Sequence, residues 1–320
     1  MTKQATGTSG LVVGIDIGGT KIALLATDIA TGEDLGSERL PTPADAGPDA
    51  MVEQIFARIR ALVESTGRPP EALRALGIAV PGYVDMEQGR VIRAGNLAGW
   101  RDIPLRDIIG RELGVPAYVD NDASTAALGE KWRGAAKKMN NFVFLALGTG
   151  VGAGVVVNGR VHRGYHNGAG EVGNFMMSRR ALGKDRGGHG DLELRIGGPA
   201  VQEQTQEELG EKLKIKDTFQ GADQGERPLK RVASRLADYI AMTVVNITAL
   251  LDPEAIIFGG GGASAGATLL EPVRMRVERE LTTVPALMRS ALGEDAQLHG
   301  AVFGALWQLD PDLALREELR

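Results

Sequence analysis

Three glycine-rich turns constrain the fold of this chain more than any other feature of its sequence. Each follows a short apolar segment, and they lie at Gly18-Gly19, at Gly148-Thr149-Gly150 and at Gly259 to Gly262. A turn of this kind lets backbone N–H groups approach a phosphate without obstruction by a Cβ atom, and it forms a small anion-binding nest. A single glycine turn is usually structural in an α/β protein. Three of them, one with an Asp before it and Thr-Lys after it, favour nucleotide binding.

The segments around these turns have the pattern of strands. Residues 11–26 contain two apolar runs that flank Gly18-Gly19-Thr20-Lys21, which predicts a hairpin. Residues 141–147 and 151–157 flank the second turn in the same way. The repeated hairpin hints at two duplicated domains that face one another, and a length of 320 residues also suggests two domains.

The usual nucleotide-binding signatures are absent from the sequence. Gly183-Lys184 is followed by Asp185, so it does not complete a P-loop. The spacing from Gly148 to Ala153 resembles a dinucleotide fingerprint, but the following residues to Val157 continue as a strand and not as a helix. This disfavours a Rossmann domain.

Hydrophobic patterning predicts further elements along the chain. We expect helices over residues 50–63 and 123–132, and a long helix whose apolar stripe runs from Val232 to Leu251. Short apolar runs predict strands at 76–80, 117–120 and 255–258. The charge-rich residues 202–216 predict a solvated helix, and residues 220–228 predict a loop.

Composition excludes several classes of protein. The net charge is −5 and the pI is near 5.6, so we expect no nucleic-acid partner, because such proteins normally have a basic surface. The chain has no cysteine, which excludes disulfides, thiolate nucleophiles and Cys-ligated metals and fits a reducing cytoplasm. Its first ten residues lack a signal-peptide core, and no apolar run reaches the ~18 residues of a membrane helix. We expect a cytoplasmic protein without a membrane partner.

Six motifs resemble the ROK family of repressors, open reading frames and sugar kinases, within the sugar kinase, heat-shock ATPase and actin superfamily. They follow the family's order and spacing across nearly the whole chain: residues 14–22 (GIDIGGTKI), 80–82 (VPG), 96–100 (NLAGW), 121–123 (NDA), 147–154 (LGTGVGAG) and 168–173 (GAGEVG). The resemblance implies an α/β chain with a two-domain actin-like ATPase, ribonuclease H-like sugar kinase fold, mixed sheets and an interdomain cleft. The expected smaller domain comprises residues 10–122 and a returning C-terminal helix within 301–320, and the larger domain comprises residues 123–300.

The resemblance also implies roles for individual residues. Asp122 is the expected catalytic base, although an Asp at this position also suits a helix cap. Asp16 is expected to orient Mg²⁺. The expected sugar-binding residues are Gly82, Asn96, Asn121, Asp122, Glu171, Asn174 and Glu193. The expected ATP-binding residues are Gly18, Gly19, Thr20, Lys21, Gly148, Thr149, Gly150, Gly260 and Gly261.

The sequence departs from the family at its zinc motif. Most members hold a structural zinc with one His and three Cys, and here those positions are Asn174, Gly183, Asp185 and Asp191. Gly187, Gly190 and Glu193 remain in register. A substitute set of Asp185, Asp191 and His189 has no thiolate and is poor for tight zinc binding. We therefore expect no zinc, and we interpret His162, His166 and His189 as ordinary loop residues.

The resemblance favours an ATP-dependent sugar kinase of the glucokinase type, with the 6-hydroxyl of a hexose as acceptor. Because the zinc-binding His also helps to position the sugar in the family, its replacement by Asn174 leaves open an aminosugar, fructose, N-acetylmannosamine or a cyclitol. A sugar sensor or regulator without catalysis is the alternative, but a ROK repressor needs a helix-turn-helix domain, and thirteen residues precede Gly14. By family analogy we expect a homodimer, with a tetramer as the alternative.

Overall fold

A computed structural model describes residues 9–316 and 319. The chain divides into two compact units, one that runs to Lys137 and resumes at Asp295, and one formed by Lys138–Glu294. These limits differ from the expected boundaries at 122/123 and 300/301. The difference arises because α3 (Asp122–Trp132) packs on α10 (Ala296–Leu309) within the first unit. A Cβ atom on Gly300 would lie 1.8 Å from the carbonyl oxygen of Thr125, so the two helices touch through backbone.

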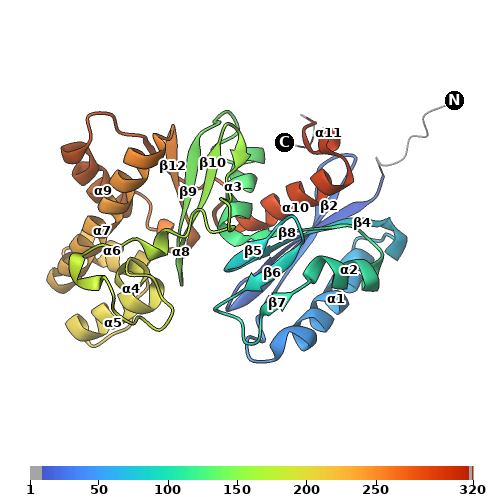
Figure 1. Cartoon of the computed structure of the whole chain (residues 1–320), viewed down its shortest axis with the longest axis horizontal. Helices are drawn as coiled ribbons and strands as arrows, with labels where there is room; N and C mark the ends of the chain where they lie inside the picture. Colours follow the sequence, from blue (N-terminus) through green and yellow to red (C-terminus); the bar gives the residue numbers. More distant parts are fainter. Residues whose placement is uncertain (1–8, 317–318, 320) are drawn as a thin grey trace. The chain divides into compact units, whose positions relative to one another are not determined.

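The first unit is built on a five-stranded sheet in the order β3-β2-β1-β4-β8. Of these strands, β2, β4 and β8 are labelled in Figure 1. β1, β4 and β8 are parallel, while β2 is antiparallel to both of its neighbours. The strands are β1 (Leu11–Ile17), β2 (Lys21–Asp28), β3 (Asp34–Pro41), β4 (Leu73–Val80) and β8 (Ala117–Asn121). The predicted hairpin over residues 11–26 is therefore confirmed as β1, the glycine turn and β2.

Helices cover both faces of this sheet. Alternate residues of β1 point to opposite faces: Val12 joins the apolar cluster of α10, and Val13 and Ile15 join that of α1 (Gly47–Ser65) and α2 (Leu105–Leu113). Burial on two faces explains why β1 is apolar at nearly every position and lacks polar alternation. A small antiparallel sheet adjoins it, with strands β5 (Tyr83–Asp85), β6 (Arg90–Arg93) and β7 (Arg101–Ile103). The last helix among the described residues is α11 (Pro311–Ala314).

The second unit contains a sheet of the same topology. Its order is β11-β10-β9-β12-β13, again with three strands joined by antiparallel pairing and then two parallel additions. The strands are β9 (Phe142–Leu147), β10 (Val151–Val157), β11 (Arg160–Val161), β12 (Ala255–Gly259) and β13 (Ala286–Arg289). The turn after β9 therefore corresponds to the turn after β1, as expected for duplicated domains.

Helices of the second unit follow the apolar periodicity except in one region. They are α4 (Glu193–Ile196), α5 (Gly198–Leu209), α6 (Ile215–Asp223), α7 (Arg227–Leu251), α8 (Gly260–Ala263) and α9 (Ala267–Glu280). The stripe predicted from Val232 is buried along α7. The single helix expected over 202–216 is wrong, because Gly210 adopts a left-handed conformation that ends α5. The loop expected over 220–228 is shorter, because Phe219 is buried and α6 continues to Asp223.

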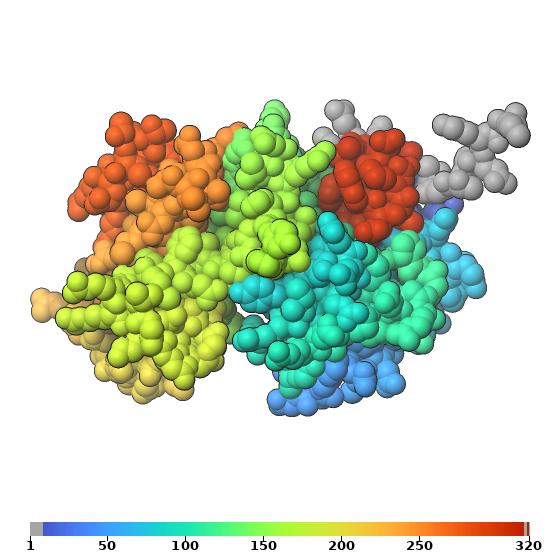
Figure 2. Space-filling view, viewed as in Figure 1, coloured from blue at the N-terminus to red at the C-terminus, as the bar shows by residue number. Residues whose placement is uncertain are grey.

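The segment between β11 and α5 is largely irregular. It contains two short 3₁₀ turns, Val172–Asn174 and Arg179–Ala181, and it lies at the surface of the second unit (Figure 2). Two further 3₁₀ turns, Pro70–Ala72 and Gly293–Asp295, occur in the connections before β4 and α10. Within residues 9–316 and 319, no helix combines the length and apolar character needed to span a membrane.

Candidate functional site

The expected site residues fall into one set in each unit. In the first unit, Asp16 lies near the end of β1, beside the Gly18-Gly19 turn, and is 8% exposed. Burial, together with the nearby charge of Asp122, raises the pKa of its carboxyl to about 7, while the charge of Lys21 acts in the opposite direction. A carboxyl held among apolar strands beside a second carboxyl is a place where a divalent cation would relieve repulsion. Asp16 is therefore suited to the expected Mg²⁺ role.

The turn after β1 is tied down by backbone and side-chain hydrogen bonds. The N–H of Gly18 donates to the carbonyl of Lys21 at 2.9 Å, and the hydroxyl of Thr42 donates to the carbonyl of Gly18 at 2.6 Å. Thr20 is exposed at its tip. Asn96, in the connection between β6 and β7, lies against this turn, since a Cβ atom on Gly19 would be 3.2 Å from that of Asn96. The turn thus has a fixed backbone and an exposed tip, as a phosphate cradle requires.

Asp122 is the first residue of α3 and is half-buried. Burial raises the pKa of its carboxyl to about 6, although hydrogen bonds from its own backbone, Ala123 and Asn121 partly offset this effect. The N–H of Ala123 donates to its Oδ1 atom at 2.8 Å. The cap of α3 is Asn121 and not Asp122, because Asn121 accepts the N–H of Ser124 at 3.1 Å. The helix cap is therefore not the role of Asp122, and its role as catalytic base stays a prediction.

Asn121 has more structural partners than the sequence indicated. Besides capping α3 it donates from Nδ2 to the carbonyl of Gly82 at 2.8 Å and hydrogen-bonds Asp122. Gly82 has φ +88°, and a Cβ atom there would lie 2.3 Å from the carbonyl of Arg93, so the turn after β4 requires glycine. Asn121 thus orients the candidate base. Its predicted sugar-binding role stays a prediction.

Sequence reasoning missed three charged residues near this set. Asp120 is 1% exposed and accepts the Tyr118 hydroxyl at 2.5 Å, and the register places it one strand beyond Ala79, the partner of Asp16. Arg39 of β3 forms an ion pair with Asp295, and both charges act on Asp16. Alternation along β8 pointed to Asp120 only weakly, and the approach of residue 39 to residue 295 has no local signal.

In the second unit, the Gly148-Thr149-Gly150 turn is joined to two other segments. The N–H of Gly198, at the start of α5, donates to the carbonyl of Gly148 at 2.8 Å. Glu193 accepts the N–H of Val151 through Oε2 at 3.1 Å, directly after the turn. A side chain on Gly150 would meet this carboxylate, because its Cβ atom would be 2.8 Å from Oε2. The expected phosphate turn and the expected sugar-binding Glu193 are therefore neighbours, and the contact of Gly198 was not predicted.

The third glycine turn lies against the end of β9. Gly260 has φ +75°, and a Cβ atom there would lie 2.6 Å from the carbonyl of Leu147, so only glycine fits comfortably. Gly261 is exposed, with no atom near its Cβ position. Gly260 thus lies beside the strand that leads into Gly148, while Gly261 faces open space.

Glu171 is half-buried and Asn174 is exposed, both in the irregular segment after β11.

Two of the residues at the zinc positions, Asp185 and Asp191, are engaged in hydrogen bonds within the protein. Asp191 is buried and accepts the N–H of Met177 and the guanidinium of Arg195, and Asp185 accepts the N–H of Gly187. The ring of His189 is hydrogen-bonded to Glu193 at 2.9 Å. Among the described residues, no three His, Cys, Asp or Glu side chains are arranged to hold a metal ion. The donor set present does not fit a structural zinc, since its carboxylates are engaged and thiolates are lacking.

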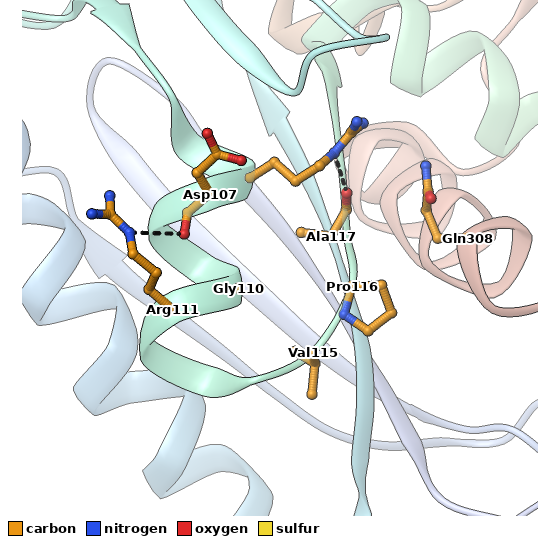
Figure 3. A pocket seen from close by; sticks show the side chains of 8 residues that line it. Asp107, Gly110, Arg111, Val115, Pro116, Ala117 and Gln308 are labelled. Carbon is orange, nitrogen blue, oxygen red and sulfur yellow. Dashed lines mark hydrogen bonds between the residues drawn. The ribbon is translucent and has the colours of Figure 1, made fainter.

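A hollow of about 670 Å³ lies elsewhere in the first unit, between α2, the start of β8 and α10 (Figure 3). Arg106 lines it and donates to the carbonyls of Ala117, Met86 and Glu87 at 3.0, 2.7 and 2.6 Å. Its guanidinium is thus used to bind backbone. None of the expected site residues lines this hollow.

Comparison with known proteins agrees with the motifs. The ROK family model matches residues 12–308. A glucokinase of Halalkalibacterium halodurans is 34% identical, with 83% of this chain and 84% of the relative aligned. A xylose repressor of Caldicellulosiruptor bescii is 28% identical, over 83% of this chain and 69% of the repressor. A solved ROK family glucokinase of Streptomyces griseus, in complex with glucose and AMPPNP, has a TM-score of 0.77 and 30% identity and covers 92% of this chain and 99% of its own.

These findings confirm the predicted fold class and enzyme class. The mixed sheets and the structural relatives show the two-domain actin-like ATPase fold, and the kinase relatives show a carbohydrate phosphotransferase. With a family model that spans most of the sequence, this chain belongs to the ROK family.

Proposed function

We propose that this protein is an ATP-dependent sugar kinase that transfers the γ-phosphoryl group to a hydroxyl of a hexose or hexose-like sugar, the 6-hydroxyl in a glucokinase-type reaction. The observation that carries the proposal is Asp122, a carboxyl at the start of α3 whose pKa burial raises to about 6. A base is most effective when its pKa lies near the working pH. The glucokinase relatives, one of them solved with glucose and AMPPNP, support the choice of sugar and nucleotide.

Asp122 would accept the proton of the attacking hydroxyl while Asn121 and the N–H of Ala123 hold its carboxylate in place. Phosphoryl transfer depends mainly on positioning and charge neutralisation, so a carboxylate with a modest pKa shift is sufficient as base. Asn96, Glu171, Asn174 and Glu193 offer polar groups for the other hydroxyls. A site that pairs hydroxyl groups rejects ligands that lack them.

ATP, when bound with magnesium, supplies the phosphoryl group and the metal charge that neutralises it. The glycine turns at residues 18–21 and 148–150 would hold the phosphates, Asp16 would hold the magnesium, and Gly260 and Gly261 would flank the adenosine. The open space at Gly261 and the constraint at Gly260 support this placement.

We expect no zinc. We also propose that the protein is a homodimer, which light scattering of the purified protein would test.

A second candidate is a sugar-responsive regulator without catalysis. The xylose repressor relative, aligned over 83% of this chain, favours it. A regulator would bind sugar and would not turn over ATP. The presence of a buried acid at Asp16 and a half-buried acid at Asp122, both with raised pKa values, favours the kinase.

The test is release of ADP from Mg-ATP over a panel of hexoses, aminosugars and cyclitols, with Asp122→Asn as control. We expect one sugar to be phosphorylated and the variant to lose about 10²- to 10⁴-fold in kcat, the usual contribution of a general base. Binding of a sugar without ADP release would support the regulator. Full activity in Asp122→Asn would show that another group is the base.

A further inference from the structure

Glu193 lies in a short helix that cannot hold its own position. The helix α4 has 4 residues, Glu193–Ile196, whereas isolated helices below about 12 residues are marginal in water. The preceding segment is irregular and rich in glycine. The orientation of the Glu193 carboxylate therefore depends on its own hydrogen bonds to the Val151 N–H and His189, and on the contacts that fix the backbone on either side of it.

Those contacts come from the residues two positions before and two positions after Glu193. Asp191 is 5% exposed, and its Oδ2 atom accepts the N–H of Met177 at 2.8 Å, which closes the segment 178–190 at its base. Its Oδ1 atom accepts a guanidinium N–H of Arg195 at 3.0 Å. Asp191 and Arg195, on either side of Glu193, are thus joined to each other, and Asp191 is also joined to Met177, which follows Asn174 and Phe175 in the chain.

Arg195 also fixes this arrangement to the core of the second unit. It donates to the hydroxyl of Tyr239 at 2.7 Å, and its guanidinium lies 4.9 Å from the centre of the Tyr239 ring. Tyr239 belongs to α7, whose apolar face packs in the main cluster of this unit. A second hydrogen bond holds the backbone, because the side-chain amide of Gln204 in α5 donates to the carbonyl of Arg195 at 2.8 Å.

We propose that Asp191, Arg195 and Tyr239 form a metal-free clamp that positions the Glu193 carboxylate for the sugar. This proposal rests on the proposed sugar kinase function. Asp191 stands where the family places a cysteine ligand of zinc, and both of its oxygens are engaged by the Met177 N–H and Arg195. The three side chains are positioning residues, because each acts on Glu193 through the backbone and not on the substrate.

The first experiment tests the clamp without using activity. Hydrogen exchange is measured on the unliganded full chain and on Arg195→Met, with Arg231→Met as matched control. Arg231 pairs with Glu208 on the surface of the same unit, and exposed pairs of this kind contribute little. We expect faster exchange across residues 177–195, including the Met177 N–H, in Arg195→Met alone. Unchanged exchange there would overturn the clamp, whether or not the protein is a kinase.

The second experiment tests the positioning of Glu193 by steady-state kinetics. In Arg195→Met we expect the KM for the sugar to rise about tenfold, while the KM for ATP and kcat at saturating sugar change less than about threefold, the pattern for loss of uniform binding. Arg195→Lys keeps the charge and should recover part of the loss, and Tyr239→Phe should give a smaller one. A clamp that opens without any change in sugar KM would refute the positioning role.

Metal content separates this proposal from a hidden metal site. We expect the purified chain to contain no stoichiometric zinc by mass spectrometry and to keep its sugar KM after treatment with a chelator. One zinc per chain, with a sugar KM that rises on chelation, would overturn the proposal. If the wild-type chain phosphorylates no sugar, the proposed function fails, and the exchange experiment still decides on the clamp.

Discussion

Two carboxyl groups of the first unit have raised pKa values for different reasons. Asp16 lies within a strand that is buried on both faces, and the charged group with the largest effect on its pKa is another carboxyl, that of Asp122. Asp122 lies at a helix start, where hydrogen bonds from Ala123 and Asn121 stabilise its charged form. Asp16 thus has a pKa of about 7, whereas Asp122, whose charged form those hydrogen bonds stabilise, has a pKa of about 6. This ordering suits a metal ligand and a base, because a cation lowers the pKa of the first and leaves the second to titrate.

The pH dependence of the reaction follows from Asp122. A base must be deprotonated, so kcat/KM for the sugar should rise with pH, with an apparent pKa of about 6, and fall about tenfold for each unit below it. Initial rates between about pH 5 and pH 8 with saturating Mg-ATP measure this limb. A profile that is flat through this range would be incompatible with Asp122 as the titrating base.

Asp16→Asn should make the unliganded protein more stable at neutral pH. The folded-state pKa of Asp16 is raised from 3.8 to about 7, so the folded chain holds a proton that the unfolded chain has lost. Stability from this group is present below pH 3.8 and is lost as the pH rises towards about 7. The variant should gain on the order of 1–4 kcal/mol at pH 8. Chemical denaturation at pH 8 and at pH 4 tests this, because the gain should nearly vanish at the lower pH.

The position of Asp122 was predictable from the NDA motif, but its environment was not. The helix that follows it needs an N-cap, and both Asn121 and Asp122 are residue types that serve as caps. Only the structure shows that Asn121 takes the cap and the carbonyl of Gly82 together. The approach of Arg39 to Asp295 joins residues 256 apart in sequence, and no local pattern encodes such a contact.

Helix α10 is attached to the first sheet through positions that have no side chain. A Cβ atom on Gly77 of β4 would lie 1.7 Å from the carbonyl oxygen of Ala301, and one on Gly14 of β1 would lie 2.6 Å from that of Leu298. These glycines therefore set the distance between helix and sheet. Their backbone conformations are ordinary ones, so the requirement for glycine is steric and comes from the partner helix.

Gly77→Ala should destabilise the first unit by about 1–3 kcal/mol or more, because the added methyl group meets backbone that cannot rotate away. Gly110→Ala is the matched control. Gly110 lies in α2 with no atom near its Cβ position, so the change should stabilise the helix by about 0.5–1 kcal/mol. Denaturant midpoints of the two variants provide the measurement. Equal midpoints would contradict the close packing of α10 on β4.

The helices and strands that have a clear local periodicity were predicted correctly from the sequence. The stripe of α7 and the hairpins around the first two glycine turns were confirmed, because each has a repeated apolar pattern bounded by glycine or proline. The break between α5 and α6 was missed, since alternating charges over 202–216 suit one continuous helix. The left-handed conformation of Gly210 decides the matter, and glycine within a charged segment is an ambiguous signal.

The two five-stranded sheets of the described residues have the same topology. Order and direction agree strand by strand, with three strands in antiparallel succession followed by two parallel ones. The turn at Gly18 and the turn at Gly148 occupy equivalent places in the two sheets. The third glycine turn, after β12, is equivalent to Pro81-Gly82 after β4. A glycine turn thus follows β1 and β9, and Gly82 and Gly260, both with positive φ, occupy a second pair of equivalent exits.

Ligand binding should stabilise the whole molecule in proportion to occupancy. A sugar that is phosphorylated should raise the free energy of unfolding by about 2.7 kcal/mol at a concentration of 100 times its Kd. Thermal unfolding with that sugar, compared with an epimer that is not phosphorylated, measures the effect. Equal stabilisation by both sugars would show that binding does not discriminate between them, and it would weaken the assignment of the sugar-binding residues.

An ion pair between Asp191 and Arg195 responds to oxidants differently from a cluster of thiolates around a metal. Peroxide converts exposed thiolates to sulfenic and higher acids, some of them irreversibly, and this chain has no cysteine to lose. Carboxylate and guanidinium groups do not undergo this chemistry. The segment 178–190, which Asp191 closes through the Met177 N–H, should therefore keep its closure during oxidative stress and metal starvation, conditions in which a thiolate–zinc loop would open.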